Sequence, residues 1–515
     1  MELTRPNSYN YRRLTVLLIL LSLLARTVLA SILELGNDEC YYWLYAQKLQ
    51  WNYFDHPPMI AIWVRLSTLN GLLPDAEWVV RLGSLISSSL ATWFVFRAVS
   101  IAKDERTGWI AACLLTTSLY AALVCGVMIM PDSPQLFFWT FSLWQLASIL
   151  KKDDELLPWL LLGISTGLCI MSKIHGLFLP FGMVMYMIFH RRTWLRNPRF
   201  YLSMIVLLLI ISPIFFWNLE NHFVTWNFHS ARVAHATDPV TDNFFEELLN
   251  QAVVTNPVCF IVIVIAMVTG LRKKQTVPLL TVYNYIALPF LFTVLALSLF
   301  RDVWFHWSGP AFVTLLPQAA CWLADRKTKL FYRFVIRGSI AVYLIVVFCW
   351  PLAVNFYPGT YGSKNSSTLG QGDITLDKYG WKKAGKEFAS LYNERQGGTA
   401  IDNLPIVCFS WWGAHSEYYF ARKVNATVLG IGDMNQLHQY SWLNDERMKG
   451  SDLDTVINIE STIEQYPVSY RQYFRHEKIL KIIPVIRGGE MVGNFYIREL
   501  WGRRQHEALA FRPEE

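Results

Sequence analysis

The chain carries a succession of apolar runs, each about long enough to cross a bilayer, from near its start to about residue 352. A membrane-spanning helix needs about 20 mostly apolar residues. Only 17% of the residues are charged, whereas soluble domains carry about a quarter. We therefore expect a polytopic α-helical membrane protein with about eleven spans. The runs are 14–33, 79–100, 108–129, 134–150, 157–172, 174–190, 200–217, 251–270, 277–299, 308–325 and 334–352.

The cations that give the chain its net charge of +7 gather in alternate connections between these runs. Cytoplasmic loops of membrane proteins are enriched in Lys and Arg, so this alternation predicts the topology. Arg5, Arg12 and Arg13 precede the first run and place the N-terminus in the cytoplasm. An odd number of spans then places the C-terminus outside. The cations form no continuous basic surface, so nucleic-acid binding is not predicted.

The composition changes at about residue 355, where Gly, Ser, Asn, Asp and Lys become common. We expect residues 1–354 to form the transmembrane domain and residues 355–515 to form an extracytoplasmic α/β domain. Residues 381–392 have helical periodicity. Short β-branched runs predict strands at 405–411, 426–430, 455–459, 479–485 and 493–497.

The first outer loop, residues 34–77, is acidic and aromatic. Asp38 and Glu39 are adjacent, and Asp55 stands beside His56 and a Pro-Pro pair. Sugar transfer with inversion needs a carboxylate that takes a proton from the attacking acceptor. It also needs cations to hold a departing phosphate. The plainer alternative is a solvated acidic loop whose aromatic rings lie in the membrane interface.

Several short elements occur in a particular order along residues 10–325. They are Asp38-Glu39, Tyr53-Phe54-Asp55-His56-Pro57, Val80-Arg81, Asp132 near Pro134, Met171-Ser172-Lys173, and Arg301 with His306. The C-terminal part adds Tyr379-Gly380-Trp381. This order resembles the GT-C superfamily of polyprenyl-phosphate-sugar-dependent glycosyltransferases. The similarity is greatest to the branch that includes the lipid A aminoarabinose transferase and the protein mannosyltransferases. His56 and Pro58 depart from that branch, which leaves the sugar open.

The resemblance implies roles for individual residues. It implies that Asp38 is the base, with Glu39 supporting it and Asp55 as the rival for that role. It also implies a phosphate- and donor-binding group, namely Lys173, Arg301, Arg81, Asp132 and His306. A structural histidine is the alternative for His306, and lysine snorkelling to the interface is the alternative for Lys173.

The outer loop 218–250 contains His222, His229, Arg232 and His235. We expect His229 and Arg232 to contact the acceptor. The histidines lack the tight spacing of zinc ligands, so no metal site is predicted. We expect no cofactor beyond the polyprenyl-phosphate-linked sugar that serves as donor substrate.

The predicted function is inverting transfer of a sugar from the lipid carrier to a lipid, glycan or protein hydroxyl at the outer face of the bacterial inner membrane. The expected partners are the lipid-linked donor, an envelope acceptor such as lipid A or lipopolysaccharide, and membrane lipids. The alternative function is a transporter or flippase of lipid-linked sugars, and a structural scaffold is a third. Transporters tend to place charges near mid-span and to have paired halves, and neither feature is evident. The glycosyltransferase interpretation requires the acids and cations to meet at the outer boundary of the bilayer.

Overall fold

The structure is a computed structural model that describes residues 10–234, 241–272, 277–326, 329–396, 404–448, 453–464 and 467–504. The chain divides into two compact units. The membrane unit consists of residues 1–30, 50–52 and 56–347, and the C-terminal unit consists of residues 31–49, 53–55 and 348–515. The C-terminal unit is therefore discontinuous, because it includes two pieces of the first outer loop.

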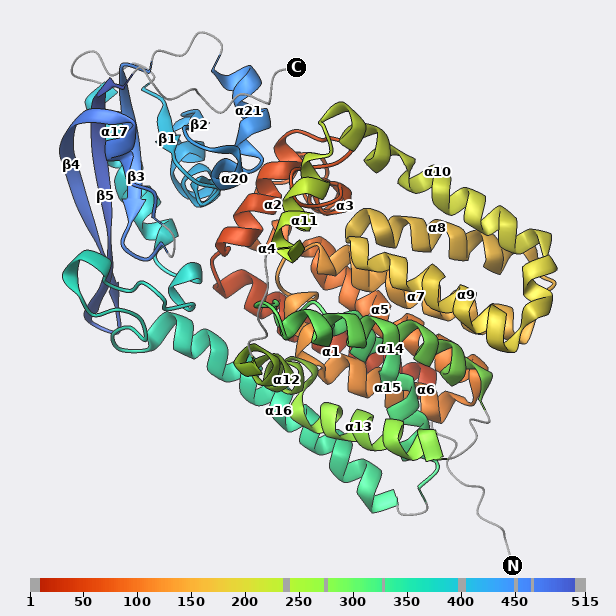
Figure 1. Ribbon diagram of the computed structural model, residues 1–515. Coiled ribbons are helices and arrows are strands. Elements are labelled where there is room, and N and C mark those ends of the chain that lie inside the picture. Colours follow the sequence, from red (N-terminus) through yellow and green to blue (C-terminus); the bar gives the residue numbers. More distant parts are fainter. Residues whose placement is uncertain are drawn as a thin grey trace, which may run out of the picture. The chain divides into compact units, whose positions relative to one another are not determined.

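The described part of the membrane unit is helical (Figure 1). Its interior is one apolar cluster to which α5, α7, α8, α14 and α15 contribute. The longer helices of the unit are α1 (Tyr11–Ile32), α3 (Met59–Ser67), α5 (Leu82–Ala102), α6 (Glu105–Thr117), α7 (Asp132–Lys151), α8 (Leu156–Ser172), α9 (Phe178–His190), α10 (Pro198–Glu220), α11 (Val224–Ala234), α12 (Thr241–Thr255), α13 (Pro257–Arg272), α14 (Pro278–Ser298), α15 (Gly309–Ala324) and α16 (Lys329–Phe356).

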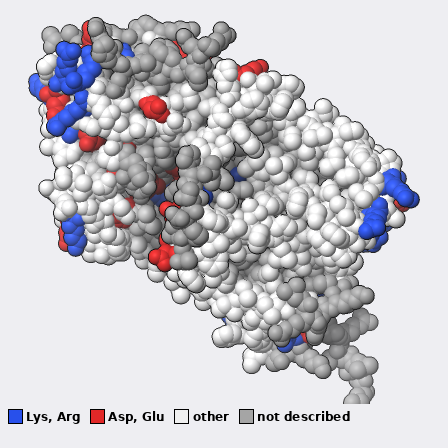
Figure 2. Space-filling view, viewed as in Figure 1, with Lys and Arg blue, Asp and Glu red and all other residues white. Residues whose placement is uncertain are grey.

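Five of the described helices are long and apolar enough to cross a membrane, namely α1, α5, α10, α14 and α16. The pair α12–α13 makes a sixth if it is one span bent by 107°. Shorter apolar helices occupy 156–172, 174–190 and 309–324. Figure 2 shows Lys and Arg at the end of the unit where α9 leads to α10, and few charges along α10. The protein is an integral membrane protein with several apolar spans, and the count of eleven stays a prediction.

Two apolar runs are interrupted in ways that hydropathy does not predict. The run at 108–129 ends as an α-helix at Thr117 and continues as a short π-helix, η1 (Tyr120–Val124). The run at 251–270 is broken at Asn256, which has a φ of 78° and precedes Pro257. The Asn256 amide donates to the carbonyls of Thr117 and Ser339, both at 3.0 Å, so this corner is fixed from two sides. The predicted outer loop 218–250 is largely helical, because α10 reaches Glu220 and α11 and α12 follow.

The C-terminal unit is built on one five-stranded sheet of order β2-β1-β3-β5-β4 (Figure 1). Strand β1 (Ile406–Cys408) pairs in parallel with β2 (Val428–Gly430) and β3 (Thr455–Ser461). Strands β4 (Phe474–Arg487) and β5 (Glu490–Arg503) form an antiparallel hairpin that adds to β3. The five predicted strands and the predicted helix, α17 (Trp381–Gln396), are confirmed. The hairpin strands are longer than predicted at both ends: Gly488 and Gly489, both with positive φ, make the turn at one end, and pairing continues to Phe474 and Arg503 at the other.

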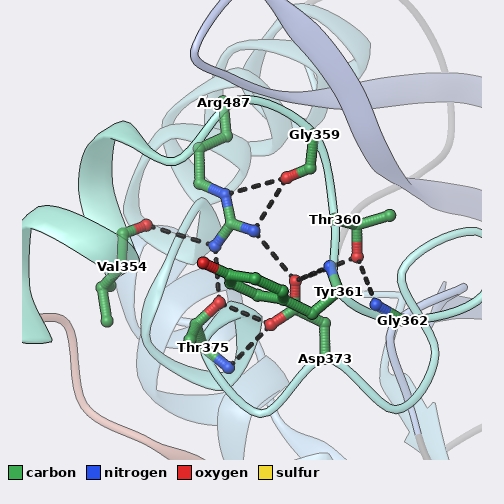
Figure 3. Close-up of polar contacts among 8 residues, drawn as sticks. All are labelled: Val354, Gly359, Thr360, Tyr361, Gly362, Asp373, Thr375 and Arg487. Carbon is green, nitrogen blue, oxygen red and sulfur yellow. Dashed lines mark hydrogen bonds and ion pairs between the residues drawn. The ribbon is translucent and has the colours of Figure 1, made fainter.

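A buried arginine ties the sheet to the end of the last membrane helix (Figure 3). Arg487, at the end of β4, forms an ion pair with Asp373 at 2.9 Å, and both side chains are fully buried. The guanidinium also donates to the carbonyls of Val354 and Gly359 and to the Thr375 hydroxyl. Val354 lies in the last turn of α16, whose final carbonyls lack helical partners. Arg487 thus caps α16 and anchors the polypeptide that leads into the sheet.

The aromatic residues of the first outer loop are not spread over a membrane interface as one interpretation predicted. Most of them lie on helix α2 (Asn37–Gln47), where Tyr41, Trp43 and Tyr45 are buried. Tyr41 meets Trp411 edge to face, and Trp43 meets Tyr418 in the same way, within the C-terminal unit. Their apolar area is covered by protein, so they serve as core residues of this unit.

Candidate functional site

Helix α2 of the C-terminal unit carries Asp38 and Glu39 in its first turn. Glu39 is almost fully buried and accepts a hydrogen bond from the Gly36 amide at 3.0 Å, which makes it a helix cap. The same Oε2 atom lies 2.6 Å from Nζ of Lys378, which is also buried. A buried carboxylate needs a charge partner, and Lys378 provides one. Glu39 is therefore a fixed structural group, and Lys378 is a partner that the sequence did not indicate.

The residues that precede helices α2 and α17 cap these helices reciprocally. The Asp377 carboxylate accepts a hydrogen bond from the amide of Asn37, at the start of α2, at 3.0 Å. The Glu34 carboxylate accepts one from the amide of Trp381, at the start of α17, at 2.8 Å. Carboxylates at helix N-termini satisfy amides that have no helical partner and interact favourably with the helix dipole. The predicted Tyr-Gly-Trp element therefore leads into the first turn of α17, and its Trp381 amide is hydrogen-bonded to the first outer loop.

Asp38 differs from Glu39 in its surroundings. Its side chain remains open to solvent, and no described side chain of the C-terminal unit donates a hydrogen bond to it. Partial desolvation by the protein atoms packed around the carboxyl, together with the nearby carboxylate of Asp377, raises the pKa of Asp38 to about 7. The ammonium of Lys378 opposes this shift. A reachable carboxyl whose pKa lies close to neutrality can accept and release protons at physiological pH.

Asp55 lies in an aromatic surrounding in the same unit. It accepts a short hydrogen bond from the hydroxyl of Tyr45 and a second one from Tyr41 at 3.3 Å. The other oxygen, Oδ2, lies 4.0 Å from Nδ1 of His438. His438 is stacked on Trp411 and has a φ of 51°, a strained backbone conformation for this residue type. Asp55 is thus held by two tyrosines, neither of which the sequence pattern had connected with it.

The membrane unit contains a separate acid–base cluster at the ends of its helices. Asp132 begins α7, and Lys173 follows the end of α8. The Lys173 ammonium lies 2.9 and 3.1 Å from the two Asp132 oxygens, and both side chains are buried. Tyr120 donates to Asp132 at 3.1 Å, and His306 lies 3.7 Å from it. Burial lowers the pKa of His306 to about 4, so its imidazole is neutral at pH 7.

This cluster unites three of the predicted donor-binding residues, Asp132, Lys173 and His306. The charges of Asp132 and Lys173 balance, so a phosphate that approached Lys173 would compete with the carboxylate. Tyr120 was not predicted, because it comes from the interrupted run whose π-helix turns it toward Asp132. The structure places Lys173 in an ion pair and thereby disagrees with lysine snorkelling to the interface.

The remaining predicted residues are placed as follows. Arg81 is fully buried between α4 (Glu77–Val80) and α5, and it donates to the Ala30 carbonyl near the end of α1 at 3.0 Å. Arg301 lies in the connection after α14, and His229 is exposed on α11. Arg232 lies on α11, but its side chain is outside the described residues. Within the described ranges, no group of three or more His, Cys, Asp or Glu could hold a metal ion.

Comparison with solved structures defines the class of this fold. The ArnT protein of Cupriavidus metallidurans, bound to undecaprenyl phosphate, superimposes with a TM-score of 0.62 at 14% identity. The match covers 94% of this chain and 98% of that one. The oligosaccharyltransferase of Archaeoglobus fulgidus matches with a TM-score of 0.50 at 12% identity, over 86% of this chain and 67% of that one. The chain therefore has an ArnT-like fold.

Sequence comparison adds a family match over part of the chain and one curated relative. Residues 55–217 match the model of the dolichyl-phosphate-mannose-protein mannosyltransferase family. The lipid A galacturonosyltransferase RgtD of Rhizobium johnstonii is 24% identical over 384 residues, which are 72% of this chain and 76% of that protein. The predicted resemblance to the polyprenyl-phosphate-sugar-dependent glycosyltransferases is confirmed, and this chain is a glycosyltransferase similar to the proteins of that group.

Proposed function

We propose that this protein transfers a sugar, with inversion, from a polyprenyl-phosphate carrier to a hydroxyl acceptor at the extracytoplasmic face, with Asp38 as the general base. The observation that carries the proposal is the state of Asp38. It is reachable, has a pKa of about 7, and stands beside a second carboxylate, Glu39, that is neutralised by Lys378. Only one carboxyl of the Asp-Glu pair is therefore available for proton transfer.

The reaction is a single displacement. The acceptor oxygen attacks the anomeric carbon, its proton passes to the Asp38 carboxylate, and a new C–O bond forms. The bond between the anomeric carbon and the phosphate oxygen breaks, and the electron pair leaves with the polyprenyl phosphate. Lys173 and Arg301 are proposed to hold that phosphate, because cations stabilise the charge that develops on the leaving group. The hydrogen bond of Arg81 to Ala30 favours a structural role for that arginine.

Asp55 is the rival base, and its contacts argue against it. The hydroxyls of Tyr45 and Tyr41 already occupy its Oδ1 atom, so this oxygen would have to release a donor before it could take a proton. We propose that Asp55 orients the acceptor. His229 and Arg232 remain proposed acceptor contacts, for which exposure of His229 is the supporting observation.

The donor and acceptor are proposed from the relatives. ArnT binds undecaprenyl phosphate, and RgtD is a lipid A galacturonosyltransferase. The first pair to test is therefore undecaprenyl-phosphate-linked galacturonic acid with lipid A. The protein is proposed to lie in a bacterial inner membrane with its N-terminus in the cytoplasm and the C-terminal unit outside.

The test is transfer of radiolabelled galacturonic acid by the purified full-length protein in detergent. We expect transfer by the wild type, a loss of at least about 100-fold in Asp38→Asn because general-base catalysis contributes that much, and partial activity in Asp38→Glu. The matched control is Asp154→Asn, which removes an exposed carboxylate from a turn and should leave the rate unchanged. Full activity of Asp38→Asn would refute the assignment of the base. Movement of the lipid-linked sugar across vesicles without transfer to any acceptor would favour the transporter alternative.

A further inference from the structure

Two adjacent residues of the C-terminal unit, Asp377 and Lys378, stand beside the Asp38-Glu39 pair but are not among the residues that the family motifs predict. They lie far along the chain from that pair, and the Lys378–Glu39 ion pair joins residues 339 positions apart. Asp377 and Lys378 end a single 3₁₀ turn, η5 (Leu376–Lys378), that precedes α17. The same turn therefore presents one carboxylate and one ammonium to the start of α2.

We propose that Asp377 and Lys378 are positioning residues of the transfer reaction, in which Asp377 fixes the start of helix α2 at Asp38 and Lys378 holds Glu39 in its capping position. This inference rests on the proposed function of Asp38. It assigns to two residues near the start of α17 a direct influence on the base, although the base itself lies in the first outer loop.

The contacts of Asp377 support the first half of the proposal. Its Oδ1 accepts a hydrogen bond from Asn37, the residue immediately before Asp38. Its Oδ2 lies so close to Gly36 that a Cβ added there would be 2.2 Å from it. Only a glycine fits at residue 36 without displacing this carboxylate. The path of the backbone into Asp38 is thus set by Asp377.

The contacts of Lys378 support the second half. Its ammonium is 2.6 Å from Glu39 and 4.0 Å from Asp377, and its side chain is 9% exposed. Without this cation, Glu39 would be a buried carboxylate that has lost its ion-pair partner, while the Gly36 amide still donates to it. It would then either take up a proton or leave its cap, and in both cases the first turn of α2 would change.

The two residues carry opposite charges and should act on Asp38 in opposite directions. The charged groups that influence Asp38 from its surroundings are Asp377, Lys378, Asp55 and Glu39, of which Lys378 alone lowers the pKa. Removal of Asp377 should lower the pKa of Asp38, and removal of Lys378 should raise it. If Glu39 became protonated after the loss of Lys378, its smaller, pKa-raising effect on Asp38 would disappear as well. The pKa of Asp38 would still rise, because the loss of Lys378 has the larger effect.

The experiment is the pH dependence of kcat/KM for the full-length protein, with the donor and acceptor named above. The acidic limb of the profile reports ionisation of the base in the free enzyme. We expect Asp377→Asn to move this limb to lower pH and Lys378→Met to move it to higher pH, each by roughly one unit, the size expected for a charge about 8 Å away at an effective dielectric constant of about 30. Lys378→Arg keeps the charge and should restore the wild-type limb.

The matched control is Lys383→Met, which removes an exposed lysine from α17 in the same unit and should leave the profile unchanged. Unchanged profiles in both Asp377→Asn and Lys378→Met, with Asp38→Asn inactive, would overturn the inference and leave the proposed function intact. An active Asp38→Asn would instead refute the proposed function. Should Lys378→Met fail to fold, the Lys378→Met/Glu39→Gln double variant removes both charges of the pair. It should still show the upward shift, and an unchanged or downward-shifted limb would count against the inference.

Discussion

The prediction that depends most directly on the described geometry concerns Arg487. We expect Arg487→Met to destabilise the protein strongly, because it removes the guanidinium from a site where both partners of an ion pair are fully buried. Asp373 would remain with its hydrogen bonds from Thr360, Thr375 and Tyr361, but without its cation (Figure 3). Breaking a buried ion pair in this way costs about 3–5 kcal/mol.

That cost can be expressed as a melting temperature. In domains of about 150–250 residues, about 1 kcal/mol changes Tm by roughly 2–4 °C. We therefore expect Arg487→Met to lower the Tm of the C-terminal unit by roughly 6–20 °C. The assay is thermal unfolding of the full-length protein in detergent, followed by tryptophan fluorescence at a fixed scan rate. Fluorescence suits the assay because Trp381 and Trp442 are buried in this unit.

Two comparisons make the Arg487 prediction testable. Arg475→Met removes an exposed arginine from the beginning of the same strand and should change Tm by no more than about 2 °C. The double variant Arg487→Met/Asp373→Asn should recover part of the loss, since it leaves no unpaired charge behind. A decrease in Tm of less than about 2 °C for Arg487→Met would show that the buried arginine does not stabilise the junction, and the reasoning would be wrong.

Three further predictions follow from the two acid–base clusters. Asp38→Asn should raise Tm at pH 8 more than at pH 5. In the wild type, the raised pKa of Asp38 in the folded state means that its stabilising contribution is present below the unfolded pKa and is lost as the pH rises through about 7. The variant has no carboxyl there and escapes this loss. Lys173→Met should lower Tm, because it leaves buried Asp132 without its cation at a cost of about 3–5 kcal/mol. Lys173→Met/Asp132→Asn should lower the stability by less than the sum of the two single variants. Additive effects of the single variants would contradict the ion pair. Tyr45→Phe should reduce the rate of transfer by about tenfold, because it removes a hydrogen bond that holds Asp55. A tenfold change corresponds to roughly 1.4 kcal/mol, the size of one hydrogen bond to a carboxylate. The control is Tyr186→Phe, which alters a buried tyrosine in α9 and should leave the rate unchanged.

Much of the fold could be predicted because its signals are local. Apolar runs of about 20 residues lead directly to α5, α10 and α14, and β-branched runs lead to the strands of the C-terminal unit. The break at Asn256 was missed although Pro257 is visible in the sequence, since a hydropathy average does not register a single left-handed residue. The π-helix after Thr117 leaves even less trace, because its residues are as apolar as those of the helix before it.

The site could be predicted only in part, because its contacts join distant segments. Asp132 and Lys173 both stand at ends of apolar runs, so their common position could be inferred from topology. Lys378 is one lysine among many in a polar segment, and nothing near it indicates that its partner is Glu39. The Tyr-Gly-Trp element did mark the correct segment, although the contacts with Asn37 and Glu39 are made by the two residues before it, Asp377 and Lys378.

The discontinuous C-terminal unit has a consequence for folding during synthesis on the ribosome. Glu39 leaves the ribosome 339 residues before Lys378. At a synthesis rate of about 5–20 residues per second, Glu39 is made roughly 17–70 s before Lys378. During that interval the segment around α2 lacks its contacts with Asp377, Lys378, Trp411 and Tyr418, and it has only the cap and the aromatic contacts that it makes within itself. With Asp38 as the proposed base, we expect competence for sugar transfer only after these residues have been made, and we expect a polypeptide truncated before them to be inert toward the lipid-linked sugar.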